Sequence, residues 1–209
     1  MRLGVFGGTF DPPHNGHLAL AHAAQLQLAL DELLWVVTAD PPHKRGIAIS
    51  PAADRVALVQ AAIAGQPGMR LSRVDVDRPG PQWAADTVRL LSEANPGAEL
   101  VYLMGGDSLR DLPNWGRPME LLRYASLGVL SRPGAVVDLA SLEQALPGLS
   151  SRLAFVPAPR LNISSHEVRG CIRAGRSIEH LVPRGVAEAI SGLGLYLRKP
   201  ERETREPGG

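Results

Sequence analysis

The chain alternates between short apolar runs and longer stretches of mixed apolar and polar positions. Helical patterns cover residues 16–30, 51–64 and 84–95, with Ser50 as the expected N-cap and Pro51 as the first residue of the second helix. Four apolar runs are expected to be strands, at 3–6, 33–38, 69–76 and 100–104. The first, second and fourth are almost continuously apolar, as strands buried on both faces are. This β-α-β alternation predicts a parallel sheet with right-handed crossovers.

The same alternation continues through the second half of the chain. No internal repeat and no Ser/Gly-rich linker interrupts it, so residues 1–197 are predicted to form one α/β domain. We expect a Rossmann-like, doubly wound parallel sheet with flanking helices. Residues 198–209 are polar and contain two prolines, which predicts a disordered tail. The further strands are expected at 127–131 and 153–156, and the further helices at 139–145, 165–174 and 186–191.

The charge and composition disfavour several classes of partner. Lys and Arg total 22 against 21 Asp and Glu, for a net charge of +1, and only 4% of residues are aromatic. An RNA-binding module needs a basic groove and stacking platforms, so no nucleic-acid partner is expected. The lone Cys171 favours a reducing compartment. No signal-peptide pattern and no apolar run of roughly 18–20 residues is found, so no membrane partner is expected and the predicted location is cytoplasmic.

The segment GVFGGTFDPPHNGH, residues 4–17, spans the predicted junction of the first strand and the first helix. Ligands of open α/β sheets bind at the carboxyl ends of the strands. Gly7 and Gly8 allow close backbone approach, and the helix N-terminus directs N–H groups and a positive dipole end to the same place. The sequence therefore predicts an anion site here. Neither GxxxxGK[ST] nor GxGxxG is present.

Two histidines take the place of the usual phosphate-loop lysine. His14 and His17 are three residues apart at a helix start, so both rings fall on nearly the same face and can donate hydrogen bonds to phosphate oxygens. Zinc binding is the alternative for an H-x-x-H pattern. No Cys, third His or carboxylate at a recognisable ligand spacing completes such a site, so no protein-bound metal is expected.

The string GGTFDPPHNGH resembles the signature of the nucleotidyltransferase superfamily that shares an H-x-G-H element with class I aminoacyl-tRNA synthetases. Within it, the chain is most similar to the bacterial nicotinate-nucleotide adenylyltransferase family, over roughly residues 1–197. Four further segments carry this resemblance: PPHKR at 41–45, DRPGPQWAADT at 77–87, GGDSLRDLPNW at 105–115 and ISSHEVRGCIRAG at 163–175.

The resemblance implies adenylyl transfer from ATP to nicotinate mononucleotide, giving nicotinate adenine dinucleotide and pyrophosphate in NAD biosynthesis. Direct attack without a covalent enzyme intermediate is expected, and Mg²⁺ would arrive with ATP, held mostly by phosphates and water. The implied catalytic residues are His14, His17, Lys44 and Arg169. Those implied for ATP binding are Gly7, Gly8, Thr9, Phe10, Gly105, Asp107, Ser164 and Ser165. Those implied for the nicotinate nucleotide are Asp11, Trp83, Asp86, Thr87 and Trp115.

The chain departs from the family pattern at two places. Gln82-Trp83-Ala84 stands where the family has Ser-Tyr-Thr, which removes the side-chain hydroxyls of that loop. His166 stands where the family has Thr, and its role, like that of Arg45, stays open. The loops at 40–50 and 77–83 are those expected to close on ligand.

Other functions also remain open at this point. The acceptor could be nicotinamide mononucleotide or phosphopantetheine, although Gly80-Pro81, Asp86-Thr87 and Trp115 favour a pyridine ring. A nucleotide-binding sensor that kept the fold but lost the chemistry is a second class, which the presence of both histidines and Arg169 disfavours. The sequence does not give the oligomeric state.

Overall fold

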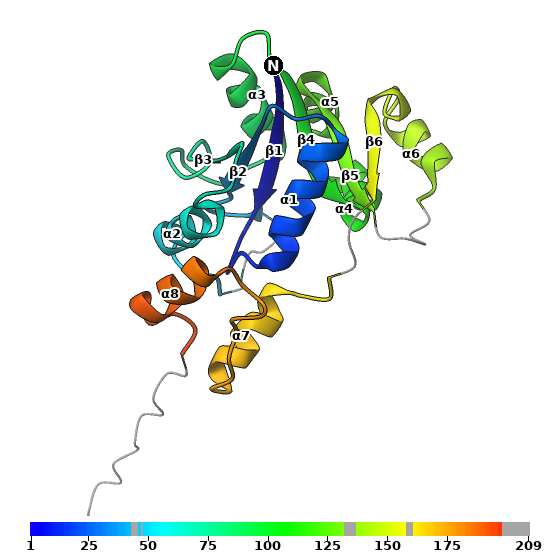
Figure 1. The fold of residues 1–209 in the computed structure, drawn as a ribbon. Coiled ribbons are helices and arrows are strands. Elements are labelled where there is room, and N and C mark those ends of the chain that lie inside the picture. The colour runs from blue at the N-terminus through cyan, green and yellow to red at the C-terminus, as the bar shows by residue number, and fades with distance from the viewer. Residues whose placement is uncertain (43–45, 47, 132–136, 158–160, 198–209) are drawn as a thin grey trace, which may run out of the picture.

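A computed structural model describes residues 1–42, 46, 48–131, 137–157 and 161–197. Its centre is a parallel sheet with the strand order β3-β2-β1-β4-β5-β6 (Figure 1). This order confirms the predicted Rossmann-like, doubly wound sheet. The strands are β1 (Arg2–Gly8), β2 (Glu32–Val37), β3 (Met69–Ser72), β4 (Glu99–Gly105), β5 (Ala125–Ser131) and β6 (Leu153–Pro157).

Helices cover both faces of this sheet. One face carries α1 (Asn15–Gln27), α2 (Ala52–Ile63), α7 (Ser165–Arg173) and α8 (Arg184–Leu193). The other carries α3 (Ala84–Ala94), α4 (Gly106–Asp111), α5 (Pro118–Tyr124) and α6 (Leu139–Ala145). Two short 3₁₀ turns, η2 (Leu112–Asn114) and η3 (Ser150–Arg152), complete the described elements.

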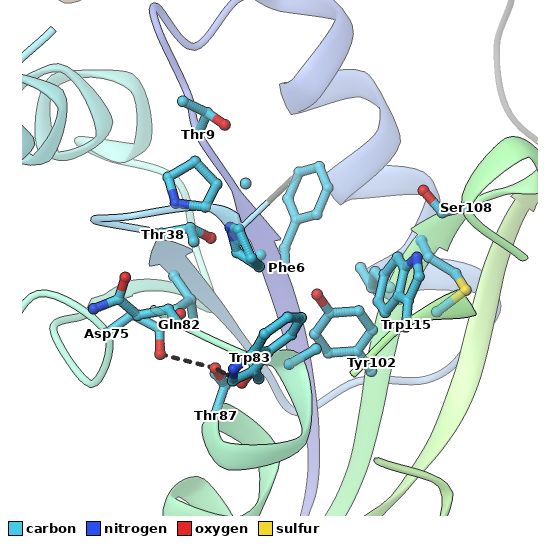
Figure 2. Close-up of a pocket in the computed structure, with 18 of the residues that line it drawn as sticks. Phe6, Thr9, Thr38, Asp75, Gln82, Trp83, Thr87, Tyr102, Ser108 and Trp115 are labelled. Atoms are coloured by element: carbon cyan, nitrogen blue, oxygen red, sulfur yellow. Dashed lines mark hydrogen bonds between the residues drawn. The ribbon is translucent and has the colours of Figure 1, made fainter. Parts of the chain in front are cut away.

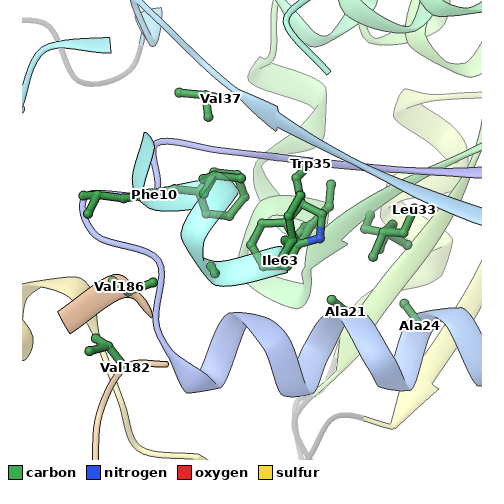
Figure 3. Packing of buried hydrophobic residues seen from close by; sticks show 14 of the residues in the cluster. Phe10, Ala21, Ala24, Leu33, Trp35, Val37, Ile63, Val182 and Val186 are labelled. Atoms are coloured by element: carbon green, nitrogen blue, oxygen red, sulfur yellow. The ribbon is translucent and has the colours of Figure 1, made fainter. Parts of the chain in front are cut away.

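The two apolar layers follow from the two-residue period of the strands. On β2, Leu33 and Trp35 pack under α1 and α2, while Leu34 packs under α3 on the opposite face. Trp35 is completely buried and lies against the rings of Phe6 and Phe10 at centroid distances of 4.9 and 5.0 Å (Figure 3). The near-continuous apolarity of the predicted strands is thus explained by burial on both sides.

The predicted third strand is too long. β3 ends at Ser72, and the next residues form a turn in which the amides of Val76 and Asp77 both donate to the carbonyl of Arg73 at 2.9 Å. Arg73 also forms an ion pair with Asp77 at 2.6 Å. The apolar residues at 74 and 76 therefore pack against the core from a turn. Apolar positions alone do not distinguish such a turn from a continuation of the strand.

The predicted start of α2 is shifted by one residue. Pro51, rather than Ser50, is the N-cap, and no side chain caps this helix. The Ser50 carbonyl instead accepts from Nε of Arg55 at 2.9 Å, and its amide donates to the carboxylate of Asp11 at 3.3 Å. The sequence pattern also missed α4 and α5, because glycines and prolines around both had indicated a loop.

No helix in the described part of the chain is long and apolar enough to span a membrane. The predicted tail at 198–209 lies outside the described residues, as do Lys44 and Arg45. The single-domain prediction and the cytoplasmic location stay predictions.

Truncating a core leucine should show how far the sheet depends on its apolar layers. Leu127 on β5 is fully buried, so Leu127→Ala should lower the free energy of unfolding by about 2–5 kcal/mol in urea titrations. Leu26→Ala, at a leucine that is 84% exposed on α1, is the matched control and should change it by less than about 0.5 kcal/mol. Equal effects of the two variants would contradict this packing.

Candidate active site

A cleft of about 790 Å³ opens at the carboxyl ends of β1, β2 and β4 (Figure 2). β1 pairs with both β2 and β4, and the strand order reverses direction between β1 and β4. Doubly wound sheets bind ligands at this switch point, and the volume is that of a small-molecule site. The predicted residues that line the cleft are Gly7, Gly8, Thr9, Trp83, Thr87, Gly105, Asp107 and Trp115.

Aromatic rings form one wall of the cleft. Trp83, Tyr102 and Trp115 all line it, and the rings of Tyr102 and Trp115 meet edge to face at 6.2 Å and 89° (Figure 2). Trp83 lies directly against Gly116, since a Cβ at that glycine would be 2.4 Å from the indole. Burial raises the pKa of Tyr102, so its hydroxyl stays protonated at neutral pH. The wall can stack on a planar ring.

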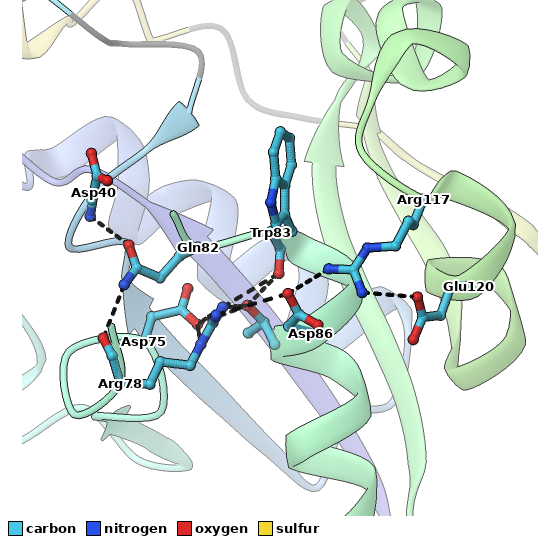
Figure 4. A network of polar contacts seen from close by, with 9 residues as sticks. Asp40, Asp75, Arg78, Gln82, Trp83, Asp86, Arg117 and Glu120 are labelled. Atoms are coloured by element: carbon cyan, nitrogen blue, oxygen red, sulfur yellow. Dashed lines mark hydrogen bonds and ion pairs between the residues drawn. The ribbon is translucent and has the colours of Figure 1, made fainter. Parts of the chain in front are cut away.

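Gln82 joins the two loops that border the cleft. Its side chain accepts from the amide of Asp40 at 2.6 Å and donates to the carbonyl of Arg78 at 3.1 Å, and its own amide donates to the Asp40 carbonyl at 3.3 Å (Figure 4). Gln82 is only 4% exposed. The replacement of the family's serine thus supplies a link between residues 40 and 78 in place of a hydroxyl.

Two residues predicted to bind the nicotinate nucleotide, Thr87 and Asp86, have partners within the protein. The Thr87 hydroxyl donates to the buried carboxylate of Asp75 at 2.8 Å, and Arg78 pairs with that carboxylate at 2.9 Å. Asp86 forms ion pairs with Arg117 at 2.5 Å and with Arg78 at 3.9 Å, and it does not line the cleft (Figure 4). Burial raises the pKa of Asp75, against the opposing effect of the Thr87 and Arg78 hydrogen bonds. The network fixes the base of the aromatic wall.

The histidine pair is assembled at the start of α1. Its ring centroids are 3.7 Å apart, and the His14 amide donates to Nδ1 of His17 at 3.2 Å. Because Nδ1 accepts, a neutral His17 carries its proton on Nε2. The His17 ring also lies against Phe6 and Phe10, at centroid distances of 6.1 and 5.2 Å. Phe6 lines the cleft, whereas neither His14 nor His17 is among the residues that line it.

His14 is a buried, uncharged histidine. It is 7% exposed, and desolvation lowers its pKa to about 4. The ring sits over Gly16, where a Cβ would be 2.9 Å from Nδ1 of His14. Its Nδ1 has no hydrogen-bond partner among the described residues. Glycine at the third position of the H-x-G-H element is therefore required by the close approach of this ring.

The N-terminus of α1 is less open to an anion than predicted. The Asn15 amide donates to the Leu181 carbonyl at 2.9 Å, and the Asn15 side chain donates to the His180 carbonyl at 3.2 Å. Part of the expected anion site is thus occupied by the segment before α8. His180 takes part through its backbone carbonyl.

The α7 residues reach the same loop from the other side. Ser164 caps α7 by accepting from the Glu167 amide, the Ser165 hydroxyl donates to the Pro12 carbonyl at 2.8 Å, and Arg169 donates from Nη1 to the Asp11 carbonyl at 2.6 Å. None of the three lines the cleft. Phe10 is a core residue at 3% exposure, so only its backbone can meet a nucleotide.

Comparisons with known proteins agree with this geometry. The cytidylyltransferase-like family model matches residues 5–170. A probable nicotinate-nucleotide adenylyltransferase of Thermomicrobium roseum is 44% identical over 195 residues, covering 93% of this chain and 91% of that relative. The chain belongs to the nicotinate-nucleotide adenylyltransferase family. A relative from Gloeobacter violaceus with the same name is 46% identical, covering 93% of this chain and 96% of its own. The protein is therefore a nucleotidyltransferase.

Solved structures show the same fold. Nicotinic acid mononucleotide adenylyltransferase of Plasmodium falciparum, complexed with NaAD, matches with a TM-score of 0.74 at 18% identity, covering 93% of this chain and 97% of that chain. A putative nicotinate-nucleotide adenylyltransferase from Vibrio parahaemolyticus matches with a TM-score of 0.66 at 17% identity, covering 94% and 96%.

Sequence reasoning missed several residues of the enzyme's cleft. Asp75 and Tyr102 both line it, yet each belongs to a segment interpreted as a plain strand. Tyr102 lies three residues before Gly105, so its position near the end of a strand could have indicated that it lines the cleft. Arg55 gave no signal at all, because it stands in an ordinary helical pattern.

The depressed pKa of His14 should make folding depend on pH. The pKa of His14 is about 4 in the folded enzyme and 6.5 in the unfolded chain. Its contribution to the free energy of unfolding is therefore complete above pH 6.5 and is lost as the pH falls toward 4. When the pH is lowered from 7.5 to 4.5, the free energy of unfolding should fall for both proteins. The fall should be about 2–3 kcal/mol smaller for His14→Gln than for the unaltered enzyme. Urea titrations at both values measure this. His22→Gln, at an exposed histidine, should follow the unaltered enzyme; a parallel loss in all three proteins would refute the shift.

Proposed function

We propose that the enzyme transfers the adenylyl group of ATP to nicotinate mononucleotide, giving nicotinate adenine dinucleotide and pyrophosphate. The names of the relatives and the fold shared with a NaAD complex support this substrate pair. The observation that carries the proposal is the stacked histidine pair at the carboxyl end of β1, beside a cleft walled by indoles. The histidines can donate to a phosphoryl centre, and the indoles can stack on a pyridine ring.

The proposed chemistry is an in-line displacement. A 5′-phosphate oxygen of nicotinate mononucleotide attacks the α-phosphorus of ATP, and the bond to the bridging oxygen of pyrophosphate breaks. An ionised phosphate is already a nucleophile, so no covalent enzyme intermediate is needed. Catalysis then rests on positioning the two substrates and on donors aimed at oxygens that gain charge.

The histidines have distinct parts in this proposal. The Nε2–H of His17, fixed by the His14 amide, donates to an oxygen of the α-phosphate as charge develops there. His14 is neutral and contributes through a single ring N–H and through its contact with His17. Arg169 donates from Nη1 to the Asp11 carbonyl, so its other guanidinium N–H groups are proposed to bind the departing pyrophosphate. Lys44 is proposed for the same phosphates.

The remaining contacts divide between the two nucleotides. Gly7, Gly8 and Thr9 offer backbone approach to the adenylate, with Gly105 and Asp107 across the cleft. Trp115 is proposed to stack on the nicotinate ring, with Trp83 as the neighbouring face. The networks of Thr87 and Asp86 give these two residues a supporting part under the aromatic wall, rather than the direct contact first expected.

Mg²⁺ is proposed to enter as part of the ATP substrate. Among the described residues no group of three or more His, Cys, Asp or Glu side chains is arranged to hold a metal ion. Phosphate oxygens and water would therefore supply most of its ligands, as is usual for this ion. The carboxylate of Asp107 is exposed in the cleft, where it can reach such an ion's water.

Removing the His17 donor tests the transferase proposal. His17→Ala should reduce kcat about 10²-fold or more, as the loss of a strong electrostatic donor does, with the fold retained by circular dichroism. Pyrophosphate release is measured with ATP and nicotinate mononucleotide, nicotinamide mononucleotide or phosphopantetheine. The matched control, His22→Ala, should keep activity within twofold. A change below about threefold would remove His17 from the mechanism, and a preference for either other acceptor would overturn the substrate assignment.

The proposed stacking role of Trp115 is tested separately. Trp115→Ala should raise KM for nicotinate mononucleotide about tenfold, while Trp115→Phe, which keeps an aromatic face, should raise it by no more than about threefold. KM for ATP should stay within twofold in both variants. An equal rise for both substrates would mean that Trp115 supports the cleft without contacting the ring.

A further inference from the structure

The carboxylate of Asp11 is buried and held by residues from two distant parts of the chain. It is 5% exposed and does not line the cleft. The Tyr196 hydroxyl donates to one oxygen at 2.7 Å, and the Ser50 amide donates to the other at 3.3 Å. The direct contact with nucleotide expected of Asp11 therefore has no support in this arrangement. Its partners point to a different use.

Tyr196 reaches Asp11 only because the chain turns sharply after α8. Gly194 ends that helix with φ of 61°, and Tyr196 itself has φ of 64°. A left-handed conformation is uncommon for a tyrosine and persists where surrounding contacts impose it. The hydrogen bond spans 185 positions of sequence and joins the end of the described chain to the loop after β1.

We infer that Tyr196 is a positioning residue, which acts through the Asp11 carboxylate to fix the loop that carries His14 and His17. The inference rests on the transferase function proposed above. Tyr196 contacts neither the cleft nor, in the proposed mechanism, any reacting atom.

The loop transmits position well because it is short and stiff. Only Pro12 and Pro13 separate Asp11 from His14, and proline fixes φ near −65°. Asp11 therefore cannot shift without carrying His14 along, and the amide of His14 sets the orientation of the His17 ring. A displacement of about 1 Å at such a site can cost on the order of 10²-fold in rate.

A buried cation completes the cluster around Asp11. Arg55 is 1% exposed, and its guanidinium donates to the carbonyls of Thr9, Thr38, Ala39 and Ser50 at 2.8–3.0 Å. Burial lowers the pKa of this guanidinium, and the negative charge of Asp11 opposes that shift. The loop is thus bound by α2 through Arg55, by α7 through Ser165 and Arg169, and by the end of the chain through Tyr196. The contact with Tyr196, like that with the Ser50 amide, is made through the Asp11 side chain.

Tyr196→Phe is the test, because it removes one oxygen and keeps the ring that packs against the core. We expect kcat for dinucleotide formation to fall about fivefold to twentyfold, with KM for both substrates within twofold, since the loop is misplaced and the cleft is intact. Tyr124→Phe is the matched control: its hydroxyl has no hydrogen bond with another described residue, and its activity should stay within twofold. A Tyr196→Phe enzyme with activity within twofold overturns the inference.

A double-mutant cycle tests the route through Asp11. Tyr196→Phe removes the donor of this hydrogen bond and Asp11→Ala removes its acceptor, so adding Tyr196→Phe to Asp11→Ala should reduce kcat by less than twofold beyond Asp11→Ala alone. If the fold-reductions in kcat of the two single variants multiply in the double variant, Tyr196 does not act through Asp11 and the inference is overturned. If Tyr196→Phe unfolds below the assay temperature, Asp11→Ala is tested alone, and a kcat within twofold of the unaltered enzyme then overturns the proposal.

A readout without substrate separates this inference from the transferase proposal. In nitrogen-detected NMR of the histidine rings, Tyr196→Phe should broaden or shift the signals of His14 and His17 and leave His22 unchanged. The His14 amide should exchange with solvent about tenfold faster, because its bond to His17 loosens. Unchanged ring signals would overturn the positioning role whatever the acceptor proves to be. An inactive parent enzyme with altered rings in the variant would instead refute only the transferase proposal.

Discussion

The fold depends on satisfying the backbone where β1 leaves the sheet. Inside the sheet β1 pairs with β2 and β4, but beyond Gly8 only the Thr38 amide still follows the strand pattern, donating to the Gly8 carbonyl. Buried carbonyls past that point need other donors. Arg55 donates to the Thr9 carbonyl of the loop after β1, while its other three hydrogen bonds go to carbonyls after β2 and before α2. Arg169 and Ser165 donate to the Asp11 and Pro12 carbonyls of the loop. The loop with the chemistry is therefore rigid because side chains replace the missing strand partners.

A second set of contacts supports the aromatic wall of the cleft in the same manner. Gln82 ties residues 40 and 78 together, and the Asp75, Arg78 and Thr87 contacts anchor the segment below Trp83. Surface ion pairs such as that of Arg117 with Asp86 add little stability by themselves, since water screens them. Their geometric effect is larger, because Arg117 follows the strand-end loop that carries Trp115 and begins α5.

Local pattern was enough to predict the sheet, most helices and the strand-end position of the motifs. Those features depend on period and on neighbouring residues, as in the apolar run of β2 or the glycines after β1 and β4. The uses of Asp11 and Asp86 were not predictable, because their partners stand 185 and 31 positions away. The prediction that Ser50 caps α2 was wrong for the same reason, because the Ser50 backbone bonds to Asp11 and Arg55. The pattern predicts that the motifs lie at strand ends, whereas which of their side chains line the cleft depends on long-range packing.

The distribution of the three tryptophans gives this enzyme an intrinsic optical reporter. Trp35 is sealed in the core at 0% exposure, whereas Trp83 and Trp115 both border the cleft. Ligand binding therefore changes the surroundings of two indoles and leaves the third as a constant internal reference. Emission intensity can report a ligand bound in the cleft without a label, and unfolding can be followed by the same signal through Trp35.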